Sequence, residues 1–77
     1  MRILTRHRGR TAATWVLTDQ KGTVKIVKAT LVRIGSEGYT YLASDGRVHA
    51  LLTVRGPEEL EKSVLRWVKE VGGGGSW

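Results

Sequence analysis

The sequence predicts an α+β domain with a four-stranded antiparallel sheet and one C-terminal helix. Apolar and polar residues alternate with a period of two up to about position 55, which indicates strands with one buried face. Beyond that position apolar residues recur at helical spacing, which indicates one amphipathic helix. Three short segments of glycine and polar residues interrupt the alternation. Three hairpin turns would join four strands into a meander.

The first predicted strand covers residues 2–18, and its apolar positions change register along the way. Leu4 is at an even position whereas Leu17 is at an odd one. We expect a bulge near Gly9, because glycine readily takes the left-handed conformation of a G1 bulge and one extra residue changes the inward face. A tight turn at Arg8-Gly9-Arg10 is the alternative, and it would give five strands.

The three predicted turns have the composition of hairpin loops. Asp19-Gln20-Lys21-Gly22 ends in a glycine suited to the left-handed conformation, and Gly35-Ser36-Glu37-Gly38 has a glycine at each end. Ser44-Asp45-Gly46-Arg47 contains Asp-Gly, the dipeptide favoured in a type I′ turn, so we expect Ser44 opposite Arg47.

These turns fix which side chains share a face. We expect Tyr41 opposite both Ala50 and Val32, and Tyr39 opposite Ile34. Since alternate residues of a strand point the same way, this face becomes the core. The opposite face is predicted to be more apolar than a solvated sheet face usually is, and it collects Thr14, Val16, Val27, Leu31, Leu42, His49 and Leu51.

The predicted helix starts at Pro57, and its charges follow the helix dipole. Acidic residues occupy its first turns, whereas Arg66 and Lys69 come late. Its apolar residues form a single stripe, which comprises Leu60, Val64, Trp67, Val68 and Val71. One helix with one stripe can cover one face of the sheet.

Composition indicates one small domain over residues 1–71 that has no catalytic chemistry. The chain has no cysteine, and His7 and His49 lack metal-ligand spacing. No nucleophile lies near a base in the sequence, so we expect neither an enzyme nor a cofactor. No apolar stretch resembles a membrane span or signal peptide. We expect a soluble monomer, cytosolic when expressed and with no natural location.

The last six residues, 72–77, are Gly-Gly-Gly-Gly-Ser-Trp. Glycine and serine form flexible linkers, because they bury too little area to offset the entropy of ordering them. A terminal tryptophan adds ultraviolet absorbance. We therefore expect these residues to be a disordered linker and tag outside the domain.

The strongest local chemical bias is a basic N-terminal segment. The net charge is +6, and Arg2, Arg6, Arg8 and Arg10 all precede the first acidic residue. As phosphate contacts these arginines would bind nucleic acid. That function is disfavoured, because Trp15, Tyr39 and Tyr41 are predicted to lie under the helix and leave no exposed stacking surface.

Two other interpretations of the basic segment remain. Cationic side chains on an edge strand discourage pairing with other sheets, so the segment could simply keep the protein monomeric. It could also be a protein-binding segment held by a rigid sheet, since arginine is common at binding hot spots. The candidate binding residues are then Arg6, Arg8, Gly9, Arg10 and Thr11.

The whole chain resembles de novo designed α+β miniproteins. The Asp45-Gly46 turn, the Pro57-Glu58-Glu59 helix start, the absence of cysteine and phenylalanine, and the appended linker carry this resemblance. It implies a synthetic scaffold whose purpose is the fold itself or the display of a segment.

The basic strand around Arg8 and Gly9 is also similar to the bulged antigenic site IV strand of the respiratory syncytial virus fusion glycoprotein. In that likeness Arg6 matches the lysine before the bulge, and Arg8 and Gly9 match the Arg-Gly at the bulge. The viral strand continues with two isoleucines and a lysine, where this chain has Arg10, Thr11 and Ala12. This second resemblance implies a designed immunogen and an antibody as partner.

Overall fold

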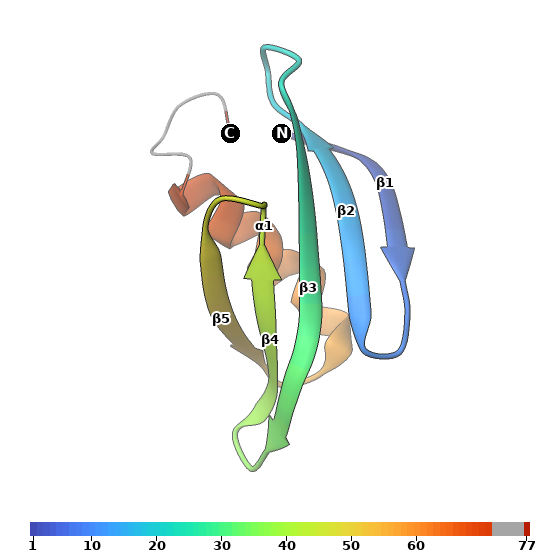
Figure 1. Cartoon of the computed structure of the whole chain (residues 1–77), viewed down its shortest axis with the longest axis vertical. Coiled ribbons are helices and arrows are strands. Elements are labelled where there is room, and N and C mark those ends of the chain that lie inside the picture. Colours follow the sequence, from blue (N-terminus) through green and yellow to red (C-terminus); the bar gives the residue numbers. More distant parts are fainter. Residues whose placement is uncertain (72–76) are drawn as a thin grey trace.

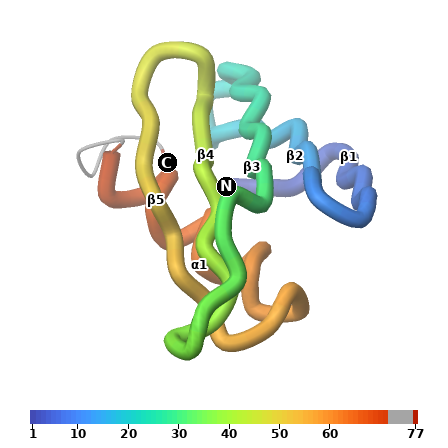
Figure 2. The backbone as a smooth tube through the Cα atoms, turned by 60° about the horizontal axis from the view of Figure 1, so that its bottom comes forward, coloured from blue at the N-terminus to red at the C-terminus, as the bar shows by residue number. Residues whose placement is uncertain are grey.

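The protein forms one five-stranded antiparallel sheet with a helix packed against it, in a computed structural model that describes residues 1–71 and 77 (Figure 1). The strand order follows the chain, so each strand pairs with its neighbour in sequence (Figure 2). The elements are β1 (Arg2–Arg8), β2 (Ala12–Thr18), β3 (Val24–Gly35), β4 (Gly38–Ser44), β5 (His49–Val54), the 3₁₀ turn η1 (Pro57–Glu59) and α1 (Leu60–Val71). No helix within residues 1–71 is long and apolar enough to cross a membrane.

The predicted α+β class and C-terminal helix are confirmed, but the prediction of four strands with a bulge at Gly9 is wrong. The chain turns there, because the Gly9 amide donates to the Ala12 carbonyl at 2.7 Å and Arg8 pairs with Ala13. Gly9 does not have the positive φ of a G1 bulge. Folding residues 2–18 back on themselves pairs backbone groups that one long edge strand would leave open.

The predicted slip in register does occur, but at Leu4. Ile3 lies opposite Leu17 and Thr5 opposite Val16, so Leu4 is the extra residue of a β-bulge in β1. A bulge changes the face on which the following side chains lie. Arg6, which pairs with Trp15, therefore faces the helix, as does Arg8 two residues later.

A second bulge lies in β3 and inverts the expected faces of that strand. Ile34 pairs with Tyr39 as predicted, but Leu31 rather than Val32 lies opposite Tyr41. The extra residue turns the preceding odd positions inward. Val27, expected on the uncovered face, is consequently fully buried.

The β4–β5 turn shows why an error in register can leave the core unchanged. Tyr41 lies opposite Leu52 instead of Ala50. The Asp45 carboxylate accepts hydrogen bonds from the amides of Arg47 and Val48, both at 2.9 Å, and this makes the loop longer than a two-residue type I′ turn. Because the shift is two residues, the same side chains still face inward.

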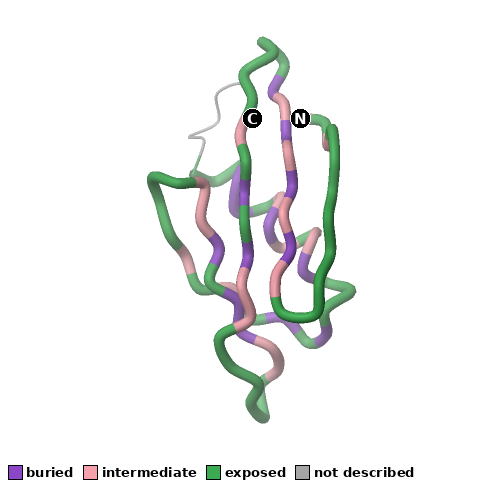
Figure 3. The backbone as a smooth tube through the Cα atoms, turned by 45° about the vertical axis from the view of Figure 1, so that its right-hand side comes forward, coloured by how far each residue is buried: buried purple, intermediate pink, exposed green. Residues whose placement is uncertain are grey.

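The core lies between the inner face of the sheet and α1. Its largest fully buried side chains are Trp15, Leu17, Val27, Val64 and Val68. The predicted helical stripe is confirmed at Leu60, Val64, Trp67 and Val68, whereas Val71 is 39% exposed. β1 differs from the inner strands, because it is exposed along nearly its whole length (Figure 3).

The predicted linker falls on residues 72–76, which lie outside the described residues. Trp77 is described, and Lys25 Nζ lies 4.8 Å from the centre of its ring. That distance is within the range of a cation–π contact. The same lysine forms an ion pair with Asp45 at 3.3 Å.

Two glycines of one turn should differ sharply in their tolerance of alanine. Gly38 has φ +130°, and a Cβ there would collide with the Val54 carbonyl, whereas a Cβ on Gly35 meets nothing within 4 Å. We expect Gly38→Ala to lower the free energy of unfolding by at least about 1–3 kcal/mol, the usual cost of a strained backbone conformation. Gly35→Ala is the matched control, and its change should stay within about 1 kcal/mol. Urea denaturation measures both, and equal effects would contradict the described turn.

Candidate functional site

The predicted binding residues all lie in one hairpin, formed by β1, the turn at residues 9–11 and β2, which we call the basic hairpin. Arg6, Arg8, Gly9, Arg10 and Thr11 are all exposed within it. Arg6 and Arg8 lie on the strand, and the other three form the tip. The structure therefore brings the predicted residues together at one end of an edge hairpin.

Arg6 connects this hairpin to the helix through a two-pronged ion pair. Its Nε donates to Glu61 Oε1 at 2.7 Å, and its Nη2 donates to Glu61 Oε2 at 3.3 Å. The bulge at Leu4 makes this possible, because it turns Arg6 toward α1. The side chains are 56% and 27% exposed, so the pair contributes about 0.2–1 kcal/mol and is weakened by salt.

Glu61 has a second and more buried partner. Trp15 is completely buried, and its indole N–H donates to Glu61 Oε1 at 2.9 Å. A buried indole N–H requires an acceptor, and here Glu61 of the helix supplies it. This hydrogen bond, followed by the hydrogen bond and charge of Arg6, lowers the pKa of Glu61 below its ordinary value, while partial burial opposes the shift.

Arg8 forms a further link to the start of the helical segment. Its Nη2 donates to the carbonyl oxygen of Pro57 at 3.3 Å, which lies in η1. Beside this contact is a small pocket of about 120 Å³, lined by the hairpin turn together with Tyr41, Pro57 and Leu60. Arg8 is thus tied to the body of the protein although its side chain remains exposed.

The tip residues are fixed unequally. Gly9 closes the turn through Ala12, and the carbonyl of Thr11 accepts a 2.6 Å hydrogen bond from the Leu31 amide. Arg10 is exposed and has no ion pair or side-chain hydrogen bond within the described part of the chain. Two backbone hydrogen bonds therefore fix the main chain of the tip, while the guanidinium of Arg10 remains unpaired and exposed.

The described residues show which groups the hairpin can offer to a ligand. No three His, Cys, Asp or Glu residues among residues 1–71 and 77 could hold a metal ion together. Trp15, Tyr41 and Trp67 are buried as predicted, so they provide no surface on which bases could stack. Tyr39, which was also predicted to lie under the helix, is only half-buried. What the hairpin offers is fixed backbone and cationic side chains.

The sequence-based search missed Glu61 and assigned it only to the favourable charge order of the helix. Two signals could have identified it. Trp15 was predicted to be inward, and a buried indole needs an acceptor from the element that covers it. Arginines that follow a change in register are also candidates for an inward ion pair.

Comparison of the chain with protein-family models, curated proteins and solved structures found no match.

Glu61 should matter more to stability than its exposed partner Arg6. We expect Glu61→Ala to lower the free energy of unfolding by about 1–3 kcal/mol, because it leaves the buried Trp15 N–H without an acceptor. Arg6→Ala should cost about 0.2–1 kcal/mol. Glu70→Ala, at an exposed site near the other end of α1, is the control. Urea denaturation measures the free energy of unfolding of each variant, and a larger loss in Arg6→Ala than in Glu61→Ala would disprove this ranking.

Acid should destabilise the protein partly through Glu61. Its pKa is lowered from an ordinary 4.5 in the folded state, so its stabilising effect is present above pH 4.5 and is lost as the pH falls through the folded pKa. Glu61→Gln cannot titrate, and it should lose less stability than the parent between about pH 7 and about pH 3. Asp45, whose pKa is also lowered, titrates in both proteins. Identical losses would show that Glu61 does not contribute.

Proposed function

We propose that this chain is a synthetic, non-catalytic scaffold that presents the Arg6 to Thr11 segment of its basic hairpin to a protein partner such as an antibody. The observation that carries the proposal is the contrast between the strand arginines of the hairpin and its tip. Its inward arginines are hydrogen-bonded to Glu61 and Pro57, whereas its tip is exposed and projects Arg10.

The binding mechanism is preorganisation. Association normally costs about 0.5–1.5 kcal/mol for each side chain that must be immobilised, in addition to the ordering of mobile loops. Backbone hydrogen bonds at Gly9 and Thr11 and the anchored side chain of Arg8 already fix this segment. Arginine adds several donors and a flat apolar surface, which suits it to hot spots.

The glycine turns, the hydrogen bonding and the charge order of the helix support a synthetic origin. Within the described residues positive φ occurs only at Gly22, Gly38 and Gly46, each in a hairpin turn. No buried side-chain nitrogen or oxygen there lacks a hydrogen-bond partner. Idealised turns, complete hydrogen bonding and a helix with acids first are design practice.

The proposal concerns a hairpin tip, and it does not include the viral epitope. The likeness to antigenic site IV depended on a strand that continues through Gly9 with a bulge. The chain turns at Gly9 instead, so Arg8 and Arg10 lie on either side of a turn. A partner would therefore contact a compact tip rather than an extended edge.

Antibody fragments selected from a naive library against the intact chain test this proposal. We expect most of the selected fragments to lose about thirtyfold or more in affinity for an Arg8→Ala, Arg10→Ala double variant, a hot-spot effect of about 2 kcal/mol. Affinities can be measured by biolayer interferometry. Lys69→Ala, a cation at an exposed position of α1, is the control and should leave binding unchanged.

Two outcomes would count against presentation by the hairpin. If most fragments bind both variants equally, the chain is a fold without a favoured binding segment. If the chain instead binds an oligothymidine strand with an affinity that falls steeply as salt is raised, the arginines serve phosphate contacts.

A further inference from the structure

The second edge of the sheet, β5, is open and lacks the features that protect β1. Its register with β4 is continuous from His49 to Val54, without a bulge, and the strand contains no proline, lysine or arginine. An unprotected edge presents backbone groups that can pair with another strand. β1 by contrast carries the bulge at Leu4 and two anchored arginines.

The register shows which backbone groups of β5 are free. The Asp45 amide donates to the Val48 carbonyl, so the backbone groups of these two residues point toward each other. In an antiparallel ladder such pairs alternate with pairs whose backbone groups point away from the partner strand. The amides and carbonyls of His49, Leu51 and Thr53 therefore face the open edge.

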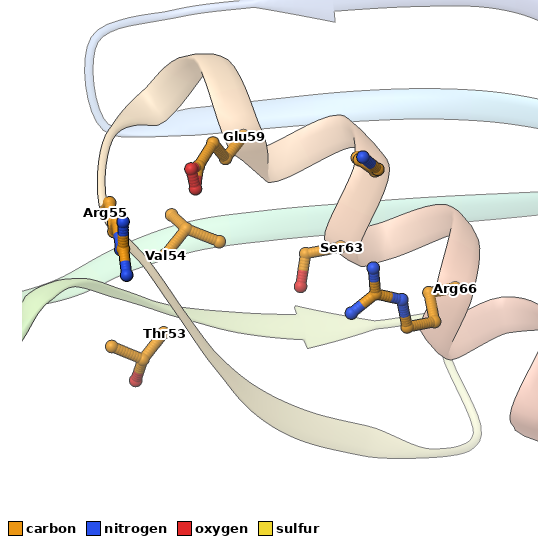
Figure 4. A pocket seen from close by; sticks show the side chains of 7 residues that line it. Thr53, Val54, Arg55, Glu59, Ser63 and Arg66 are labelled. Carbon is orange, nitrogen blue, oxygen red and sulfur yellow. The ribbon is translucent and has the colours of Figure 1, made fainter.

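A groove of about 440 Å³ lies between the end of β5 and α1. Thr53 and Val54 line one wall, and Lys62, Ser63 and Arg66 of α1 line the other (Figure 4). Figure 4 shows the Ser63 side chain pointing away from the helix and the Arg66 side chain lying beside it. Arg55 also lines the groove at the end of β5.

The groove is cationic. Three cationic residues line it, Arg55, Lys62 and Arg66, together with one acidic residue, Glu59. Within the described residues none of the three cations has an ion-pair partner. An open strand edge beside a positively charged helix face thus offers both backbone pairing and charge to the same ligand.

We propose that β5 and α1 form a docking site for an extended acidic peptide, which adds to the sheet as a sixth strand. Backbone hydrogen bonds to Leu51 and Thr53 supply register-dependent affinity, as in other cases of strand addition. Alternate side chains of the peptide point toward the groove, where carboxylates meet Lys62 and Arg66. This surface is separate from the basic hairpin at the other edge of the sheet.

Charge decides between such a peptide and a second copy of the chain. Antiparallel pairing of two β5 edges about a two-fold axis would place both helices on the same side of the joined sheet, each with Lys62 and Arg66 on the face toward β5. Like charges at close range disfavour that association, and each chain carries a net charge of +6. The same positive charge attracts an acidic strand.

The probe is a fluorescent seven-residue peptide of alternating glutamate and valine, capped at both ends. We expect saturable binding by fluorescence anisotropy, with NMR shift changes at the amides of His49, Leu51 and Thr53. A Lys62→Glu, Arg66→Glu double variant should bind about tenfold more weakly or worse. Lys28→Glu, Lys69→Glu is the matched control, because it makes the same change in net charge outside the groove.

Several results would overturn the docking site. Equal weakening by the control would mean that only net charge attracts the peptide. Equal affinity for a peptide N-methylated at alternate amides would exclude strand pairing, and shift changes confined to β1 would place the peptide at the other edge. Dimerisation through β5 in sedimentation experiments would identify a second copy as the occupant. Circular dichroism confirms that each variant is folded.

Discussion

The contact between Trp15 and Glu61 organises this protein, because it joins the largest fully buried side chain of the sheet to the helix that covers it. Within the described residues, α1 provides the second layer of the domain. Trp15 can be buried beneath it only if its indole N–H finds an acceptor there. Glu61 provides one, and the same carboxylate holds Arg6. A single acid near the start of α1 thus sets how the helix and the first hairpin lie together.

The two edge strands of the sheet differ in regularity and in the charges beside them, and their candidate functions differ for that reason. β1 is interrupted at Leu4, and its arginines turn inward to the helix, which leaves a rigid hairpin with a projecting tip. β5 is regular, and it lies beside a cationic groove. The first edge suits recognition by a partner that surrounds a protruding loop. The second suits a partner that pairs along the backbone.

Both proposed surfaces depend on rigidity. The basic hairpin is held at Arg6, Arg8 and Thr11, and β5 is held by continuous pairing with β4. A small domain has little stability to spare, so contacts that fix a binding segment also contribute to the fold. Loss of Glu61 would loosen the basic hairpin as well as the core.

The sequence by itself determined the class of fold, the helix with its buried stripe, and most of the turns. These depend on local periodicity and on residues such as Gly22 and Pro57, whose backbone preferences act over a few positions. Trp15, Tyr41 and Val64 were recognisable as core for the same reason. The two-residue error in the predicted β4–β5 register did not change the predicted core, because a shift of two residues keeps the same side chains on the inward face.

Only the tertiary structure decided the number of strands and the location of the bulges at Leu4 and Val32. A slip of one residue was visible in the sequence, but a bulge and a turn produce the same change of face. The choice between them depends on whether the backbone groups of residues 2–18 find partners in one another. That long-range pairing also placed Arg6 against Glu61, which no local pattern encodes.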